Sequence, residues 1–131
     1  MSDVNRLLAA FDSGELLRPS SEVPNIVDLS RAIAALAEAA DVQPTPGSRR
    51  IAGSIGSSDH LVFVLADGLG VNLIEGLPED SFLSTHFAAE LRTVFPSATA
   101  VALTSIATGQ WLAKHGVTGW WTHLPEIEAA A

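Results

Sequence analysis

The fold of this chain depends first on the stretch Leu61-Val-Phe-Val-Leu-Ala-Asp-Gly-Leu-Gly70. Its first six residues are apolar and rich in branched side chains, which is typical of a strand covered on both faces of a parallel sheet. Asp67 follows this expected strand directly, and the glycines behind it allow a tight turn. Ligands of open α/β sheets bind at the carboxyl ends of strands, so a carboxylate here is placed to hold a metal ion or polarise a substrate. Turn formation by Asp67-Gly68 alone is an equally good explanation.

A second segment, from residue 91 to residue 109, predicts a strand followed by a helix. Leu91-Arg-Thr-Val-Phe95 has strand character and ends at Pro96, and residues 98–108 show helical periodicity before a C-terminal Gly109. Ser97 and Thr99 flank the expected helix start. The helix dipole and the free backbone N–H groups favour an anion there, and a hydroxyl is a possible nucleophile. Both residue types are also common N-caps with no further role.

The two segments reinforce each other because they are expected to form consecutive parallel strands. The strand ends would then lie at one edge of the sheet, so that Asp67 and Thr99 converge. A divalent ion shared by a carboxylate and a hydroxyl lowers the pKa of the hydroxyl and stabilises an alkoxide for attack on phosphorus. The sequence therefore predicts half of a metal-assisted phosphoryl-transfer site.

The remaining elements complete an α/β pattern. Helices are expected over residues 3–11, 26–40, 70–76 and 81–90, with Asn25 as the N-cap of the second, and a Pro/Gly/Ser-rich linker over residues 41–59. This order predicts an α/β domain with a right-handed parallel crossover. We divide the chain into N-terminal helices and linker (residues 1–59) and the first part of an α/β domain (residues 60–131).

Composition narrows the functional classes. The 131 residues are 47% hydrophobic and 17% charged, which indicates a globular protein. A net charge of −8 argues against nucleic-acid binding. Cys is absent, which excludes disulfides and thiol catalysis and fits a cytoplasmic protein. No secretory signal is recognisable, and no apolar run is long enough for a membrane span.

Other polar and aromatic residues have plainer interpretations. His60, His86, His115 and His123 lack the spacing of a helical metal site, and His115 is expected to make structural hydrogen bonds. Three hydroxyl residues inside the second helix are expected to pack or to bond back to the helix: Thr104, Ser105 and Thr108. The tryptophans near the end are expected to cover the core: Trp111, Trp120 and Trp121.

The motifs from about Leu61 to Trp121 resemble the alkaline phosphatase superfamily, and most closely its type I phosphodiesterase/nucleotide pyrophosphatase branch. The resemblance rests on the apolar strand ending in Asp67-Gly68, then Phe95-Pro-Ser-Ala-Thr99, Thr108-Gly109 and His115-Gly116, in that order. It implies a three-layer α/β sandwich with a largely parallel central sheet. It also implies hydrolysis of small phosphate esters or nucleotides with two divalent ions of the zinc type. In that mechanism Asp67 and Thr99 bind one ion and Thr99 forms a phosphothreonine intermediate.

Three departures from the family pattern limit this expectation. Ala98 replaces a larger residue before the nucleophile, and Ala102 stands where nucleotide pyrophosphatases carry an Asn that contacts phosphate. The family's remaining Asp and His ligands lie far beyond residue 131, so we expect a truncated, inactive fragment that self-associates through an exposed sheet edge. The alternative is a small non-catalytic α/β binding module. Sulfatase or phosphomutase chemistry is a third possibility, because one fold serves several reactions.

Overall fold

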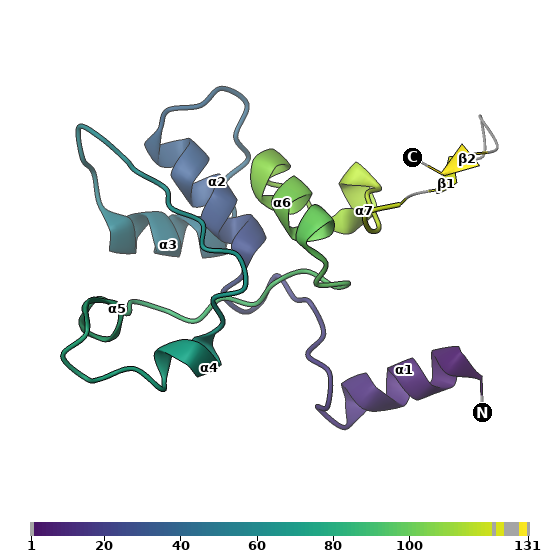
Figure 1. Ribbon diagram of the computed structural model, residues 1–131. Helices are drawn as coiled ribbons and strands as arrows, with labels where there is room; N and C mark the ends of the chain where they lie inside the picture. Colours follow the sequence, from purple (N-terminus) through teal and green to yellow (C-terminus); the bar gives the residue numbers. More distant parts are fainter. Residues whose placement is uncertain (1, 122, 125–128, 131) are drawn as a thin grey trace.

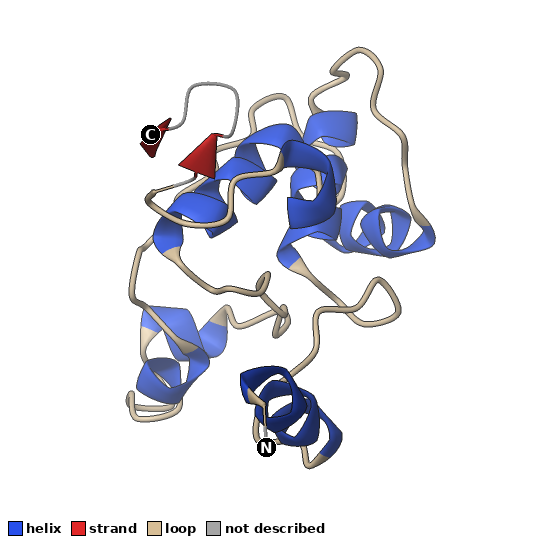
Figure 2. Ribbon diagram, turned by 90° about the vertical axis from the view of Figure 1, so that its right-hand side faces the viewer, coloured by secondary structure: helices blue, strands red, loops and turns tan. Residues whose placement is uncertain are grey.

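The protein is described by a computed structural model that covers residues 2–121, 123–124 and 129–130. Figures 1 and 2 show that this part of the chain is mainly helical. The helices are α1 (Asp3–Asp12), α2 (Ile26–Leu36), α3 (Pro46–Ile55), α4 (Val71–Ile74), α5 (Phe82–Thr85), α6 (Thr99–Thr108) and α7 (Leu112–His115). Two short strands, β1 (His123–Leu124) and β2 (Ala129–Ala130), pair antiparallel near the C-terminus.

The expected α/β sandwich is wrong for the described residues, because they contain no central parallel sheet. Residues 61–66 run as a long connection from the end of α3 toward the middle of the molecule (Figure 1), without strand pairing. Their side chains are largely exposed, reaching 82% for Val62 and 79% for Val64. Residues 91–95 contribute one isolated parallel bridge, between Arg92 and Asn25. The right-handed crossover is therefore also absent.

The apolar pattern of residues 61–66 misled the prediction for a physical reason. Such a pattern indicates that a segment suits burial between two layers. A strand forms only when a neighbouring segment pairs with it through backbone hydrogen bonds. Within the described residues no such neighbour lies beside this segment. Its backbone groups are left to water, which satisfies them at an exposed position.

The expected linker over residues 41–59 is also wrong, because it contains α3. Thr45 caps this helix: its hydroxyl accepts from the Ser48 N–H at 3.0 Å, while the Ser48 hydroxyl accepts from the Thr45 N–H at 2.8 Å. Pro46 occupies the first helical position, where its fixed φ and missing N–H cost nothing. Pro46 and Ser48, which suggested a linker, thus belong to the start signal of a helix.

A buried polar cluster joins α2 to α3. Asn25 caps α2 as predicted, accepting from the Asp28 N–H at 2.8 Å, and its amide donates to the Asp28 carboxylate at 2.8 Å. The Thr45 hydroxyl donates to the other oxygen of the same carboxylate. Gly47 packs so closely that a Cβ built there would lie 2.1 Å from Asp28 Oδ2. Asp28 is only 4% exposed, so these bonds replace the water that its burial removes.

The apolar core is small and lies between α2 and α6. Val27, Val94 and Val101 are buried in it, with Trp111 and Leu112 packed on its edge. Two side chains of α2 also hold the end of α6: the Ser30 hydroxyl donates to the Ile106 carbonyl, and Arg31 Nε donates to the Gly109 carbonyl at 2.8 Å. The predicted C-cap Gly109 is confirmed, and its φ of 62° is left-handed. A cation at this helix end also complements its negative dipole.

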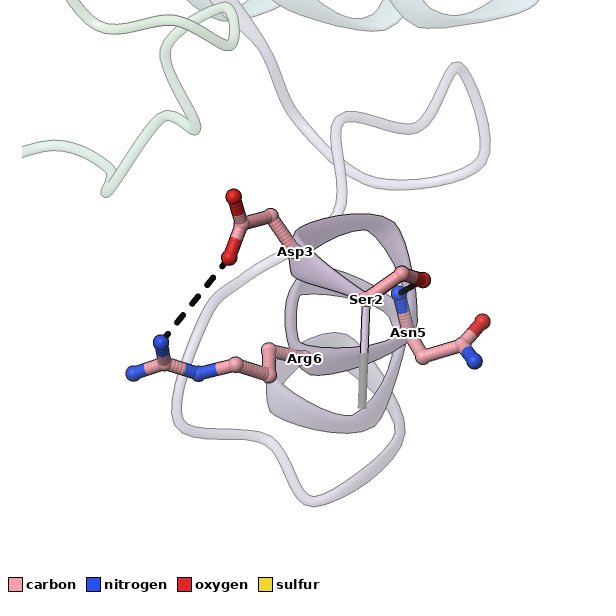
Figure 3. A network of polar contacts seen from close by, with 4 residues as sticks. All are labelled: Ser2, Asp3, Asn5 and Arg6. Carbon is pink, nitrogen blue, oxygen red and sulfur yellow. Dashed lines mark hydrogen bonds and ion pairs between the residues drawn. The ribbon is translucent and has the colours of Figure 1, made fainter.

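Helix α1 lies apart from this core in both views (Figures 1 and 2). Its start is stabilised locally, since the Ser2 hydroxyl accepts from the Asn5 N–H at 3.3 Å and Arg6 lies 3.9 Å from the Asp3 carboxylate (Figure 3). Both charged side chains of that ion pair are exposed, so the pair contributes little to stability. At the other end of α1, the Phe11 ring packs edge-on against the Phe95 ring, with 5.2 Å between the ring centroids.

The tryptophan prediction holds for one residue of three. Trp111 packs against the core as expected. Trp120 and Trp121 are 68% and 78% exposed, so the expectation that they cover the core is wrong. They lie in the segment before β1, away from the contact between α2 and α6 (Figure 1).

Candidate functional site

Asp67 and Thr99 line the same cavity, although no parallel strands bring them there. The cavity has a volume of about 420 Å³ and lies between residues 65–70 and α6. Its other lining residues belong to the segment before α6 or to the α6 helix: Thr93, Ser97, Ala102, Leu103 and Ile106. Asp67 is the one charged side chain among those that line it. The cavity therefore joins the two segments that the sequence singled out.

A tight turn places Asp67 at this cavity. The turn comprises Asp67 and Gly68, and Gly68 has φ of 74°, a left-handed conformation that side chains rarely adopt. The Asp67 side chain is exposed. Turn geometry, rather than a strand end, is thus what positions this carboxylate.

Core packing on both sides places Thr99. Val94, five residues before it, is 3% exposed, and Val101, two residues after it, is fully buried. The segment is also tied to the start of α2, because the Arg92 carbonyl accepts from the Ile26 N–H at 3.0 Å and the Arg92 N–H donates to the Pro24 carbonyl at 2.9 Å. Thr99 itself is partly exposed at the first position of α6.

The start of α6 lacks a side-chain cap. Its N-cap residue is Ala98, so the sequence-based alternative that Ser97 or Thr99 caps the helix is wrong. The other helices of ten or more residues in the described part of the chain are capped, by Ser2, Asn25 and Thr45. Within that same part, the Thr99 hydroxyl makes no hydrogen bond to protein. First-turn N–H groups without acceptors and a positive dipole end suit an anionic ligand.

His115 holds the opposite end of α6 through a defined tautomer. Its Nδ1 accepts from the Val117 N–H at 3.1 Å, and its Nε2 lies 2.9 Å from the fully buried hydroxyl of Ser105. A neutral ring that accepts at Nδ1 carries its proton on Nε2, so His115 donates to Ser105. The pair cannot act as a serine–base dyad in this tautomer, and the predicted structural role of His115 is confirmed. Thr104 and Thr108 bond back to the helix as predicted.

The metal site implied by the family is not completed by the residues described. Asp67 and Thr99 are two oxygen ligands at the cavity, whereas zinc sites in proteins use at least three protein ligands. Across residues 2–121, 123–124 and 129–130, no group of three or more His, Asp or Glu side chains is arranged to hold an ion. The described donor set therefore does not fit the family's two-ion centre, and the predicted roles of Asp67 and Thr99 in metal binding and catalysis stay predictions.

Two features of the site escaped the sequence reasoning. One is the apolar wall of the cavity, which Leu65, Leu103 and Ile106 form on facing segments. The spacing of Thr99, Leu103 and Ile106 already indicated this wall, since residues three and four apart lie on the same face of a helix. The other is the uncapped start of α6. Ala98 indicates it in the sequence, because Ala is a poor N-cap.

The open helix start and the unbonded Thr99 hydroxyl suit a phosphate group, whereas the Asp67 carboxylate suits a cation beside it. Comparison with protein families agrees: the model of type I phosphodiesterase / nucleotide pyrophosphatase matches residues 61–128. Because the match covers more than half of the chain, the protein belongs to this family, as its motifs suggested. The family is generally metal-dependent and acts on small phosphate esters or nucleotides. Neither a curated protein nor a solved structure matches the chain.

Among the described helices, none combines the length and apolarity needed to cross a bilayer.

Proposed function

We propose that this chain carries the nucleophile half of a metal-dependent phosphoric ester hydrolase. In this proposal Thr99 is the residue that attacks phosphorus. Asp67 and Thr99 would hold one divalent ion of the zinc type, and the ligands that would complete a two-ion centre are not among the described residues. The observation that carries the proposal is the shared cavity, which joins the family's Asp-Gly and Phe-Pro-Ser-Ala-Thr motifs without any sheet between them.

In this proposal the start of α6 and the Thr99 hydroxyl have different roles. The uncapped first turn of α6, which reaches the cavity at Thr99, stabilises negative charge on the phosphoryl oxygens. The Thr99 hydroxyl attacks phosphorus without first losing a hydrogen bond to protein, since it has no protein partner among the described residues. A metal ion held by Asp67 and Thr99 would supply positive charge that lowers the pKa of that hydroxyl.

We also propose that the 131-residue chain does not turn over substrate alone. Water activation in a two-ion mechanism needs a second set of ligands, and the described residues offer none arranged for it. The same observation favours the second candidate, a binding module that takes up a phosphate ester without cleaving it.

The test uses the isotopically labelled full chain and two simple probes, zinc chloride and inorganic phosphate. NMR titration is expected to shift the amide signals of residues 67–70 and 97–101 selectively. Asp67→Asn should weaken the zinc response, and Asp59→Asn, which alters an exposed carboxylate outside the cavity, serves as the matched control. Shifts spread over the surface, or equal losses in both variants, contradict the proposal.

A second measurement separates catalysis from binding. Release of nitrophenol from aryl phosphate mono- and diesters should not exceed the background of the Thr99→Ala variant. Turnover by the native chain that disappears in Thr99→Ala would refute inactivity but support the nucleophile. Turnover that persists in Thr99→Ala would refute the role of Thr99.

A further inference from the structure

Both polar and apolar side chains line the cavity beside Thr99. Asp67, Thr93, Ser97 and Thr99 provide the polar groups, and the proposed function places the phosphoryl group at Thr99. Away from them, Leu103 and Ile106 continue along the same face of α6, and Leu65 and Leu69 belong to the facing segment. A phosphate ester bound at Thr99 would therefore extend its organic group along Leu103 and Ile106, with Leu65 and Leu69 on the facing segment.

We infer that the organic group of the substrate is an unbranched aliphatic chain rather than a nucleoside, an inference that rests on the proposed function. Along α6, the wall from Thr99 to Ile106 is roughly 10 Å long at ~1.5 Å per residue. A flexible alkyl chain follows such a wall and removes apolar surface from water on both sides. The cavity volume of about 420 Å³ lies in the usual range for small-molecule sites.

The base of a nucleoside lacks a stacking partner among the residues that line this space. No aromatic side chain is among the residues that line the cavity, so a base has no ring on which to stack. Ala102 supplies only a methyl group to the lining, where a polar side chain would be needed to bond to a ribose or a base. Unpaired polar groups of a nucleoside would be desolvated against leucine side chains, which weakens binding.

The experiment measures affinities of the full chain for ethyl, butyl, hexyl and decyl phosphate, for inorganic phosphate and for AMP by NMR titration. Each methylene that enters the cavity should strengthen binding about two- to fourfold, with a plateau once the chain exceeds the apolar wall. Hexyl phosphate should bind at least about tenfold more tightly than AMP, as expected for several buried methylenes.

A variant inside the cavity and a matched variant outside it test the location. Leu103→Asn should flatten the chain-length dependence and leave the affinity for inorganic phosphate unchanged. Leu8→Asn is the control, because Leu8 on α1 is 43% exposed and Leu103 is 42% exposed. Equal effects of the two variants would overturn the inference.

The outcomes distinguish this inference from the proposed function. If inorganic phosphate binds near Thr99 but affinity is independent of chain length, the aliphatic inference fails and the proposed function stands. If neither phosphate nor any ester shifts the signals of residues 67–70 and 97–101, the proposed function itself fails. If hexanol binds as tightly as hexyl phosphate, the cavity does not select a phosphate ester and the inference is overturned.

Discussion

The starts of α3 and α6 are built in opposite ways. At α3, the Thr45 hydroxyl and Ser48 satisfy the first turn, and the buried carboxylate of Asp28 bonds to Thr45. At α6, the N-cap is Ala98 and the Thr99 hydroxyl makes no bond to the described protein. One helix start has used its hydrogen-bonding capacity for stability, whereas the other retains it. This difference indicates which helix end is available to a ligand.

The largest expected effect is steric, at the closed helix start. Gly47→Ala should lower the free energy of unfolding by about 3 kcal/mol, because the new Cβ would overlap the bonded Asp28 carboxylate. Gly53→Ala in the same helix meets nothing within 4 Å and should stabilise the protein by about 0.5–1 kcal/mol. Urea unfolding of both variants measures the contrast. Similar values for the two variants would mean that the cluster around Asp28 is not rigid.

The next effect compares the two threonines directly. Thr45→Ala should cost about 2 kcal/mol, since it removes a cap and a hydrogen bond to a buried carboxylate. Thr99→Ala should change stability by less than about 0.5 kcal/mol, as expected for a partly exposed side chain without a bonding partner. Urea unfolding of the pair decides the point. A large loss for Thr99→Ala would show that its hydroxyl has a structural partner and is not free for a ligand.

A smaller effect is expected where His115 holds the far end of α6. Ser105→Ala should cost about 1 kcal/mol, because it removes the acceptor of the imidazole proton. Nitrogen chemical shifts of the labelled ring should show the Nε2–H tautomer at neutral pH in the native chain. A proton on Nδ1 instead would contradict the Val117 hydrogen bond and reopen a role for His115 as a base.

A modest gain in stability is expected from closing the open helix start. Ala98→Ser supplies a cap to α6 and should stabilise the protein by about 0.5–1 kcal/mol. The same variant should weaken phosphate binding, since the added hydroxyl occupies an N–H group that the ligand needs. Thermal unfolding and phosphate titration of one variant therefore test both sides of the comparison. A gain in stability with undiminished phosphate binding would show that the ligand does not use this helix start.

Short-range chemistry in the sequence was a good guide to individual elements. It predicted the hydrogen-bonding role of His115, although the partner, Ser105, lies ten residues away. It also located α1, α2 and α6, the Asn25 cap and the C-cap Gly109. These features depend on residues within about one helical turn of each other, which the sequence displays directly. The Pro and Ser residues of 45–48 carried an equally local signal, and treating them as linker residues overlooked the capping box.

The family motifs and the candidate residues could likewise be read without a structure. Asp67 and Thr99 are recognisable because their neighbours form an ordered set of motifs, and the family match supports that set. The convergence of the two residues depended on the fold. The reason given by the sequence, adjacent parallel strands, does not apply, because residues 61–66 have no pairing partner in the described part of the chain.

Tertiary contacts decided what remained. Strand pairing is a property of two segments, so an apolar run such as Leu61–Ala66 does not specify its own neighbour. The packing of Val94 and Val101 beside α2 placed Thr99 at a cavity with Asp67. Whether a hydroxyl is bonded or free, and whether a helix start is closed or open, follows from which groups that packing brings within hydrogen-bonding distance.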